Sequence, residues 1–318
     1  MISHCGGGYS RYEDLAVTRW RADGTADSTG QFCYVKDVKA DHVWSAAHQP
    51  VCAPPDQYRA ELATDRVTFH RREHGIETRT EVVAVPEDSA EVRRVSVTNE
   101  TDVVREIELT SYGEIVIAPP DADRQHPAFA NLFVETEWHP WCSAITATRR
   151  PRAAGERTLW CVHVVDCGGS ERVGEPSCET DRARFLGRGR SPRDPIALEH
   201  DGTLSGTTGA VLDPVFGIRV RLRLKPRECA SAAFTTLVAD SRARAFALAD
   251  RYHDPSTAQR ALDLAWTAAQ VELRELGVSP AEAAAYQELA GHLFYADPAV
   301  RAPESELRGN HGGQPLLW

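Results

Sequence analysis

The sequence predicts a mainly β protein that ends in helices, with a large antiparallel β-sandwich over residues 1–238 and a helical linker over residues 239–300. Three observations predict this division. Apolar and polar residues alternate in several segments of the first three quarters of the chain, clusters of turn-forming residues separate those segments, and helical spacing replaces the alternation near Asp240. Short strands without helices between them indicate antiparallel sheets rather than βαβ units.

The strands are recognised by a period of two. In residues 216–224 the apolar side chains share one face and three arginines take the other, so one face should be buried and the other in water. Residues 76–82 and 107–117 alternate in the same way. Residues 160–165 are apolar on both faces, which suits an interior strand. Turn-forming residues separate the strands at 86–89, 99–102, 119–123, 168–170 and 225–228.

Three helices are expected after Asp240. The first spans residues 241–252, and the second begins with Asp254 as N-cap and Pro255 at the first helical position. Its apolar stripe, spaced by three and four residues, ends before Gly277 and consists of Ala258, Leu262, Trp266, Ala269, Leu273 and Leu276. The third opens with a capping box, Ser279 to Glu282, and carries Leu289, Leu293 and Phe294. Apolar stripes on three helices require a surface to pack against.

Composition excludes several classes of protein. The 318 residues include 36 Lys+Arg and 46 Asp+Glu, and the net charge of −10 disfavours nucleic acid or an anionic membrane as the main partner. No stretch approaches the ~18 apolar residues that span a bilayer, and the first twenty residues lack the apolar core of a signal peptide. The eight scattered cysteines form no CxxC pair, which indicates free thiols, no zinc site and a cytoplasmic location.

Three motifs have a structural explanation beside a functional one. His70 to His74 matches the inverted zinc-protease pattern HxxEH, but that chemistry needs a helix and this segment is typical of a strand and turn. Glu135 and Glu137 share a strand face and could form a glycosidase pair, although a solvated face explains them better. The arginine-rich segment 182–193 could bind phosphate, carboxylate or RNA, and pairing with neighbouring acids is the favoured explanation.

Two segments are candidates for binding sugar, because carbohydrates combine C–H faces that stack on aromatic rings with hydroxyls that need donors and acceptors. Gly6-Gly-Gly8 lets the backbone approach a ligand or another chain closely, and the side chains that follow are Tyr9, Ser10 and Arg11. The second segment supplies Trp44, His48 and Gln49. A half-buried tryptophan in a sandwich core is the more common explanation for Trp44.

Longer segments resemble a known family. Residues 6–25 (GGGYSRYEDLAVTRWRADGT) and 32–50 (FCYVKDVKADHVWSAAHQP) resemble the N-terminal domain of glycoside hydrolase family 94, formerly glycosyltransferase family 36, and most closely the phosphorylase-like region of cyclic β-1,2-glucan synthases. The resemblance continues in collinear order through residues 97–138, 179–198, 211–226 and 262–277. It implies a galactose-mutarotase-like β-supersandwich, then linker helices, an (α/α)6 barrel and a small C-terminal β domain.

The resemblance also implies a reaction, an inverting phosphorolysis or its reverse, in which inorganic phosphate or a sugar phosphate is co-substrate and no other cofactor is needed. One carboxylic acid protonates the leaving oxygen while phosphate attacks the anomeric carbon. In the family that acid and the phosphate-binding residues belong to the barrel, so no catalytic residue carries over to this chain. Residues 301–318 are expected to start the barrel region; Gly313 to Trp318 resembles a family segment, from which Pro315 and Leu316 depart.

The expected function is therefore a carbohydrate-binding module that positions β-glucan or gluco-oligosaccharide, supports dimerisation and is not catalytic alone. In family dimers the N-terminal loop of one protomer reaches its partner's active site, which implies such a role for residues 6–11. The alternative is one part of a split phosphorylase completed by a separate barrel polypeptide. A stand-alone carbohydrate-binding protein remains a third hypothesis.

Overall fold

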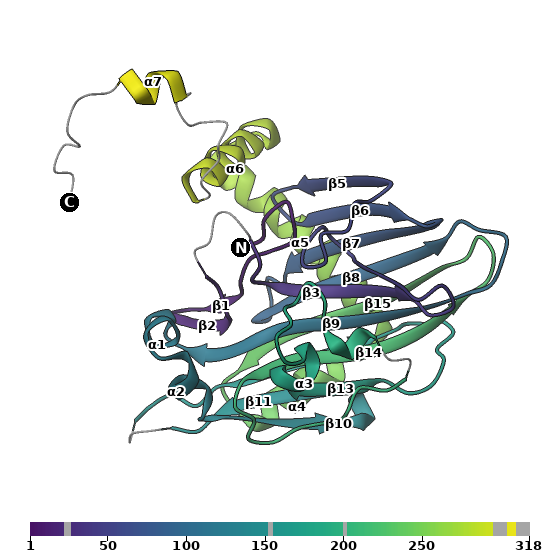
Figure 1. Ribbon diagram of the computed structural model, residues 1–318. Helices are drawn as coiled ribbons and strands as arrows, with labels where there is room; N and C mark the ends of the chain where they lie inside the picture. Colours follow the sequence, from purple (N-terminus) through teal and green to yellow (C-terminus); the bar gives the residue numbers. More distant parts are fainter. Residues whose placement is uncertain (22–26, 152–154, 200–201, 295–303, 310–318) are drawn as a thin grey trace.

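The computed structural model describes residues 1–21, 27–151, 155–199, 202–294 and 304–309 (Figure 1). Two antiparallel sheets pack face to face over the first 239 residues, and helices follow from residue 242. The predicted antiparallel β fold with C-terminal helices is confirmed. The expectations for residues 295–303 and 310–318, including the terminal segment from Gly313 to Trp318, lie outside the described residues.

The first sheet holds seven strands in the described part of the chain, with the long strand β9 at its centre. β9 pairs with β14 along one edge, and with β3 and β2 in succession along the other. All pairings in this sheet are antiparallel. Its strands are β1 (Arg11–Tyr12), β2 (Leu15–Thr18), β3 (Gln31–Asp37), β4 (His42–Ser45), β9 (Arg105–Ala118), β13 (Ser177–Asp181) and β14 (Pro214–Leu224).

The second sheet runs in the order β10-β11-β12-β15-β8-β7-β6-β5 and is also antiparallel throughout its described strands. β12 lies between β11 and β15, so the segment that is apolar on both faces is an interior strand, as predicted. The strands are β5 (Gln57–Leu62), β6 (Val67–Glu73), β7 (Ile76–Ala84), β8 (Ala90–Asn99), β10 (Val134–His139), β11 (Ala144–Arg149), β12 (Trp160–Asp166) and β15 (Cys229–Ala239).

The main core fills the space between the sheets. β9 and β14 contribute Ile107, Leu109, Phe216 and other side chains from one side, and the second sheet contributes residues such as Ile145 and Phe234 from the other. These side chains are at most a few per cent exposed. Alternation with a period of two brings them to the same face of each strand, which is why the pattern in the sequence predicts the core.

Both outer faces of the sandwich are also covered. α4 (Arg242–Tyr252) packs on β12 and β15, and α5 (Pro255–Leu276) packs on β7 and β8, so these two helices back the eight-stranded sheet (Figure 1). α3 (Arg182–Leu186) and η2 (Ile196–Leu198) cover the seven-stranded sheet. The other short helices are α1 (Pro120–Gln125), α2 (Pro127–Asn131), η1 (Pro140–Cys142) and α7 (Glu304–Gly309).

The predicted helix starts are confirmed by their caps. The Asp254 carboxylate accepts a hydrogen bond from the Ser256 backbone N–H at 2.8 Å. Ser279 and Glu282 form the reciprocal capping box in front of α6 (Pro280–Phe294), with each side chain accepting from the other residue's backbone N–H. These caps fix where the chain enters α5 and α6.

Three expectations need correction. Residues 119–123, expected as a turn, contain the start of α1, and short helices interrupt the strand succession. The stripe of α5 is shifted: Trp266 and Leu276 are 55% and 73% exposed, and the buried side chains are Ala258, Ala261, Leu262, Ala265 and Ala269. The α5 side chains that face the sheet are therefore mostly alanines.

The arginine face of β14 is not uniformly wet either. Arg219 is 4% exposed and donates to the Gly202 and Ala197 carbonyls at 2.8 and 2.5 Å. These residues belong to the segment around η2, which covers this part of the seven-stranded sheet. Arg221 is partly buried beside Glu108, and Arg223 is the most exposed of the three. The exposed fraction of these arginine side chains therefore rises along β14 from Arg219 to Arg223, with distance from the segment around η2.

Candidate functional site

The triglycine serves the chain's own packing. Gly6 has φ +93°, and a Cβ there would lie 2.6 Å from the Ala47 Cβ. Gly8 has φ +142°, and a Cβ there would lie 2.0 Å from the Met1 carbonyl oxygen. Both positions require glycine because of their conformation and because another part of the chain is close. The close approach seen at Gly6 and Gly8 is to residues 47 and 1 of the same chain.

Tyr9 and Arg11 line an open hollow of about 190 Å³, the Tyr9 hollow. Trp20, which follows β2, lies against Tyr9 with 5.3 Å between the ring centroids and a 52° angle between the planes. The other residues that line the Tyr9 hollow come from β2 and α1, and they are Ala16, Thr18, Pro120, Asp123 and Arg124. Figure 1 shows α1 beside β1 and β2 at one end of β9. The hollow combines two aromatic rings with two arginines and a carboxylate.

Ser10 serves a different purpose from its neighbours. Its hydroxyl donates to the Glu91 carboxylate at 2.8 Å and accepts from the Gln31 side-chain amide at 2.9 Å. These bonds join the N-terminal segment to β8 and β3. The structure therefore gives Ser10 an anchoring role beside the Tyr9 hollow and no direct part in its lining.

Trp44 is fully buried in the core between the sheets, at 0% exposure. Its ring has no open face, so the expectation that it stacks on a sugar is wrong for this structure. The indole Nε1 is buried without a hydrogen-bond partner among the described residues. The simpler explanation, a tryptophan that fills the sandwich core, holds.

His48 and Gln49 support the N-terminal segment. The Gln49 backbone N–H donates to the Cys5 carbonyl at 2.8 Å, and Tyr58, whose ring lies 6.2 Å from that of His48, donates its hydroxyl to the His4 carbonyl. Burial, with Arg71 nearby, lowers the pKa of His48. The structure therefore separates these two residues from the Tyr9 hollow and gives them a positioning role.

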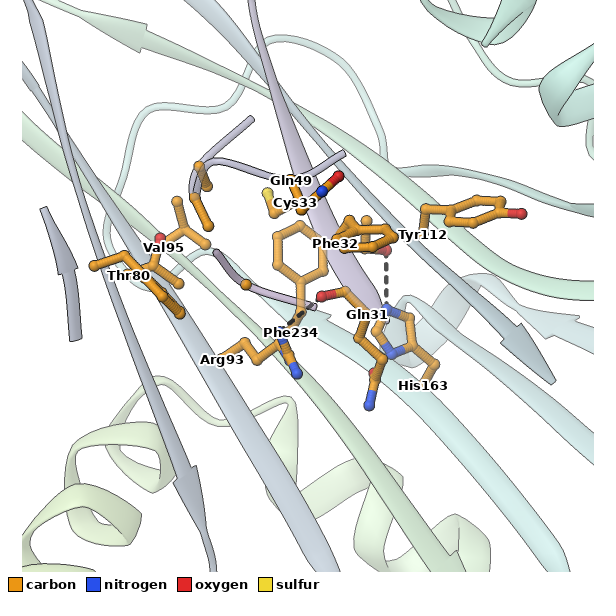
Figure 2. Close-up of a pocket in the computed structure, with 15 residues that line it drawn as sticks. Gln31, Phe32, Cys33, Gln49, Thr80, Arg93, Val95, Tyr112, His163 and Phe234 are labelled. Carbon is orange, nitrogen blue, oxygen red and sulfur yellow. Dashed lines mark hydrogen bonds between the residues drawn. The ribbon is translucent and has the colours of Figure 1, made fainter. Parts of the chain in front are cut away.

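A small cavity with a largely apolar lining lies between the sheets near Gln49 (Figure 2). His163 bridges the sheets there: one ring nitrogen bonds the Ser111 hydroxyl and the other the Thr236 hydroxyl, both at 2.9 Å. Burial, together with Arg93, lowers the pKa of His163 to about 3, so the ring is neutral. The cavity, about 20 Å³, has room for one water and none for a sugar ring.

No motif in the sequence identifies Arg19, which forms ion pairs with three carboxylates near the Tyr9 hollow. Arg19 is 8% exposed, and its Nη1 donates to Glu114 at 2.6 Å and to Asp213 at 3.2 Å. Its Nε and Nη2 donate to Asp123, which lines the Tyr9 hollow. The only signal in the sequence is position, because Arg19 and Trp20 directly follow β2. Partners more than 90 residues away cannot be identified from such a signal.

The cluster around Arg19 shifts the pKa values of two carboxyl groups in opposite directions. Burial alone would raise the pKa of Glu114, but Arg19 and Arg182 hold it below its ordinary value. Burial raises the pKa of Asp213, and Arg19 opposes that shift only in part. Burial also disfavours the charge on Arg19, yet its bonds to Asp123 and the proximity of Glu114 raise its pKa. The arginine therefore stays charged and fixes the geometry between β2, β9 and α1.

The other motifs have structural roles. His70 lies in β6 and His74 in the following turn, so the HxxEH segment is not helical; His74 instead contacts His42 at 3.1 Å between ring nitrogens. Glu135 pairs with Arg150 at 3.1 Å and Glu137 lies 3.5 Å from Arg242.

The arginine-rich segment pairs with acids, as favoured above: Arg182 with Glu114 at 2.8 Å, and Arg190 with Glu199. Among the described residues no cluster of three or more His, Cys, Asp or Glu side chains could hold a metal. Within the same residues, no helix has the length and apolar character to cross a bilayer.

Two antiparallel sheets with helices on both outer faces define the class of protein, a β-supersandwich with linker helices. The model of the glycosyl hydrolase 94 supersandwich domain matches residues 1–255, and the chain belongs to that family. It is 35% identical over 319 residues to cyclic beta-(1,2)-glucan synthase NdvB of Rhizobium meliloti (strain 1021), covering 100% of this chain and 11% of that protein.

Two further matches are more distant. The chain is 26% identical to N,N'-diacetylchitobiose phosphorylase of Vibrio proteolyticus, over 72% of this chain and 28% of that enzyme. The crystal structure of a bacterial glucoamylase complexed with acarbose matches with a TM-score of 0.43 and 9% identity, over 80% of this chain and 32% of that one. The chain therefore spans about a tenth to a quarter of the two curated relatives' length.

Proposed function

We propose that this chain is a glycan-positioning module of a family 94 glycosyltransferase or phosphorylase that acts on β-glucans, and that it is not catalytic alone. The observation that carries the proposal is the Tyr9 hollow. Tyr9 and Trp20 present aromatic surface, and Arg11 and Arg124 place guanidinium groups beside it. Aromatic rings take the C–H faces of a sugar, while arginine and carboxylate groups bond its hydroxyls.

The linker helices support a second part of the proposal, an (α/α)6 barrel as partner domain. Beyond Ala269 the side chains of α5 are partly or fully exposed, and α6 has one buried side chain among those described, Ala283. Tyr286 and Leu289 are each 59% exposed on α6. Figure 1 shows α6 beyond the β5 edge of the sandwich. A helix with this much exposed apolar surface needs a covering domain.

The barrel would supply the acid that protonates the leaving oxygen, and phosphate or a sugar phosphate would be its co-substrate. In a dimer of barrel-containing chains, the Tyr9 hollow would contact glucan held by the partner's barrel. The alternative, a split phosphorylase whose barrel is a separate polypeptide, rests on the same exposed α6 surface. Both forms require the chain alone to lack turnover.

The first test measures phosphate release from glucose 1-phosphate with gluco-oligosaccharide acceptors. The purified chain should release none, and release would show that catalytic groups lie within it. In a barrel-containing protein, Tyr9→Ala and Arg11→Ala should each lower turnover. The matched control is Arg227→Ala, in the exposed turn between β14 and β15. Unchanged kinetics in both hollow variants would refute the role proposed for Tyr9 and Arg11.

A second test measures binding directly. Calorimetry of the purified chain with β-1,2- and β-1,4-gluco-oligosaccharides should detect binding that Trp20→Ala weakens. The control is Trp141→Ala, because Trp141 is also exposed (57%) but follows β10 in the other sheet. Equal losses in the two variants would contradict a specific role for Trp20.

A further inference from the structure

A larger hollow adjoins the Tyr9 hollow across the Arg19–Asp123 ion pair, and the proposed function assigns it no role. Asp123 lines the smaller hollow and Arg19 lines the larger one. Glu114, Asp213 and Arg182 are among its polar lining, and we call it the Arg182 groove. Its volume of about 770 Å³ lies within the range of small-molecule sites.

Hydrogen-bonding groups are left open in this groove. Arg182 uses Nε for Glu114 at 2.8 Å, while its two η nitrogens make no hydrogen bond within the described residues. One oxygen of Asp213 accepts from Asn131 at 2.7 Å and from Arg19; the other lies 3.5 Å from the Arg182 Nε. An arginine donor pair therefore lies beside a carboxylate acceptor, and both side chains are about a third exposed.

Each arginine of the groove is paired with a carboxylate. Arg19 and Arg182 pair with Glu114 and Asp213, which also line the groove. Arg21 lies 3.9 Å from Asp123, which lines the Tyr9 hollow. An anion would find cations that are already neutralised, and a cation would find carboxylates in the same condition. A neutral ligand that both donates and accepts hydrogen bonds meets neither penalty.

Apolar side chains border the same groove. Phe129, Leu132 and Leu212 are 53%, 46% and 76% exposed. Phe129 belongs to α2, and Leu212 precedes β14, so two separate segments present apolar surface to one hollow. Apolar surface around a neutral set of donors and acceptors matches a sugar, which has C–H faces between its hydroxyls.

We propose that the Arg182 groove is a saccharide-binding site in its own right, which takes a neutral oligosaccharide by bonding vicinal hydroxyls to Arg182 and Asp213 and by packing its rings on Phe129 and Leu212. The choice of β-glucan as ligand rests on the proposed function. The site itself does not depend on the Tyr9 hollow, because its four contact residues come from α2, α3 and the segment directly before β14.

The experiment is calorimetry of the full chain with a β-1,2-gluco-oligosaccharide. Phe129→Ala, Leu212→Ser and Arg182→Gln should each weaken binding about tenfold, the effect expected for losing a stacking or bidentate contact. The first two change exposed side chains, so folding should be kept; a circular dichroism melt checks it. Val103→Ser is the matched control, because Val103 is 58% exposed and precedes the far end of β9.

Each outcome decides the proposal. Loss in the groove variants, with binding kept in Val103→Ser, supports the groove, whether or not Tyr9→Ala also weakens binding. Loss in Tyr9→Ala alone overturns the groove and leaves the proposed function standing. Absence of saccharide binding in every protein overturns the groove, and the turnover test then decides the Tyr9 hollow separately. Reduced self-association of the groove variants in sedimentation, with unchanged sugar binding, would overturn it in favour of a protein interface.

Discussion

His163 is the residue whose chemistry depends most on the sandwich around it. Its ring stacks near Phe216 and Phe234, with centroids 5.2 and 6.0 Å away, so the two sheets enclose it. Each of its ring nitrogens bonds a hydroxyl, from Ser111 or Thr236, and both bonds suit the neutral ring because a hydroxyl can donate or accept. A proton on this ring would bury a charge with no carboxylate bonded to it.

Replacing His163 with Gln should change how the free energy of unfolding depends on pH. The pKa of the buried ring is about 3, against an ordinary value of 6.5 for histidine, so below pH 6.5 the unfolded chain binds a proton that the folded chain does not. Above pH 6.5 the difference in the free energy of unfolding between the wild type and His163→Gln should be constant. Below pH 6.5 the free energy of unfolding of the wild type should fall relative to that of the variant, by up to about 1.4 kcal/mol for each pH unit.

Urea unfolding at pH 7.5, 6.0 and 5.0 measures this difference. Other titrating groups shift both proteins alike, so only the gap between the two curves is informative. A gap that stays constant from pH 7.5 to 5.0 would show that His163 is accessible to protons in the folded protein.

At the scale of elements, β14 shows that identical side chains on one strand face take different roles, depending on whether another segment of the chain covers them. Arg219, Arg221 and Arg223 occupy equivalent positions along one face, and each pairs with a glutamate of β9. Arg219 also bonds the backbone carbonyls of Ala197 and Gly202, under the segment around η2. It joins that segment to the sheet, whereas Arg223, the most exposed of the three, pairs with the side chains of Glu106 and Glu171.

Arg219→Gln should therefore lower the free energy of unfolding by about 3 kcal/mol, because buried carbonyls lose a charged donor and cannot reach water. Arg223→Gln is the matched control on the same strand face and should change stability little. Chemical denaturation of both variants gives the comparison. Equal effects would mean that the segment around η2 does not depend on Arg219.

Local signals explain what the sequence predicts at this scale. Strand alternation, the Asp254 cap and the Ser279–Glu282 box involve residues within a few positions of one another, and the structure confirms them. The wet face expected at Arg219 is wrong, and Trp44 is fully buried rather than half-buried, because segments distant in sequence cover both side chains. The sequence singles out Tyr9 and Arg11, which line one hollow, but not Trp20 and Arg19, since the positions of these two depend on the pairing of β2 and the place of α1.

At the scale of the whole molecule, the layers differ in how much they depend on the helices. The eight-stranded sheet has an apolar outer face, where Val92, Val162 and Leu237 pack under α4 and α5. α5 contributes Leu262, which is fully buried, and several alanines to this layer. None of the described side chains of α6 contributes to it. The first half of α5 is therefore part of the sandwich, whereas α6 extends from it.

Two truncations should separate these roles. A chain that ends at residue 278 lacks α6 and should unfold at nearly the same urea concentration as the full chain, because α6 buries little surface. A chain that ends at residue 254 also lacks α5, exposes the apolar layer under it and should unfold at clearly lower urea. The chain ending at 278 is thus the control for the shorter one. A large loss of stability on removal of α6 alone would show that α6 packs on the sandwich, and would remove the reason for assigning its apolar side chains to a barrel.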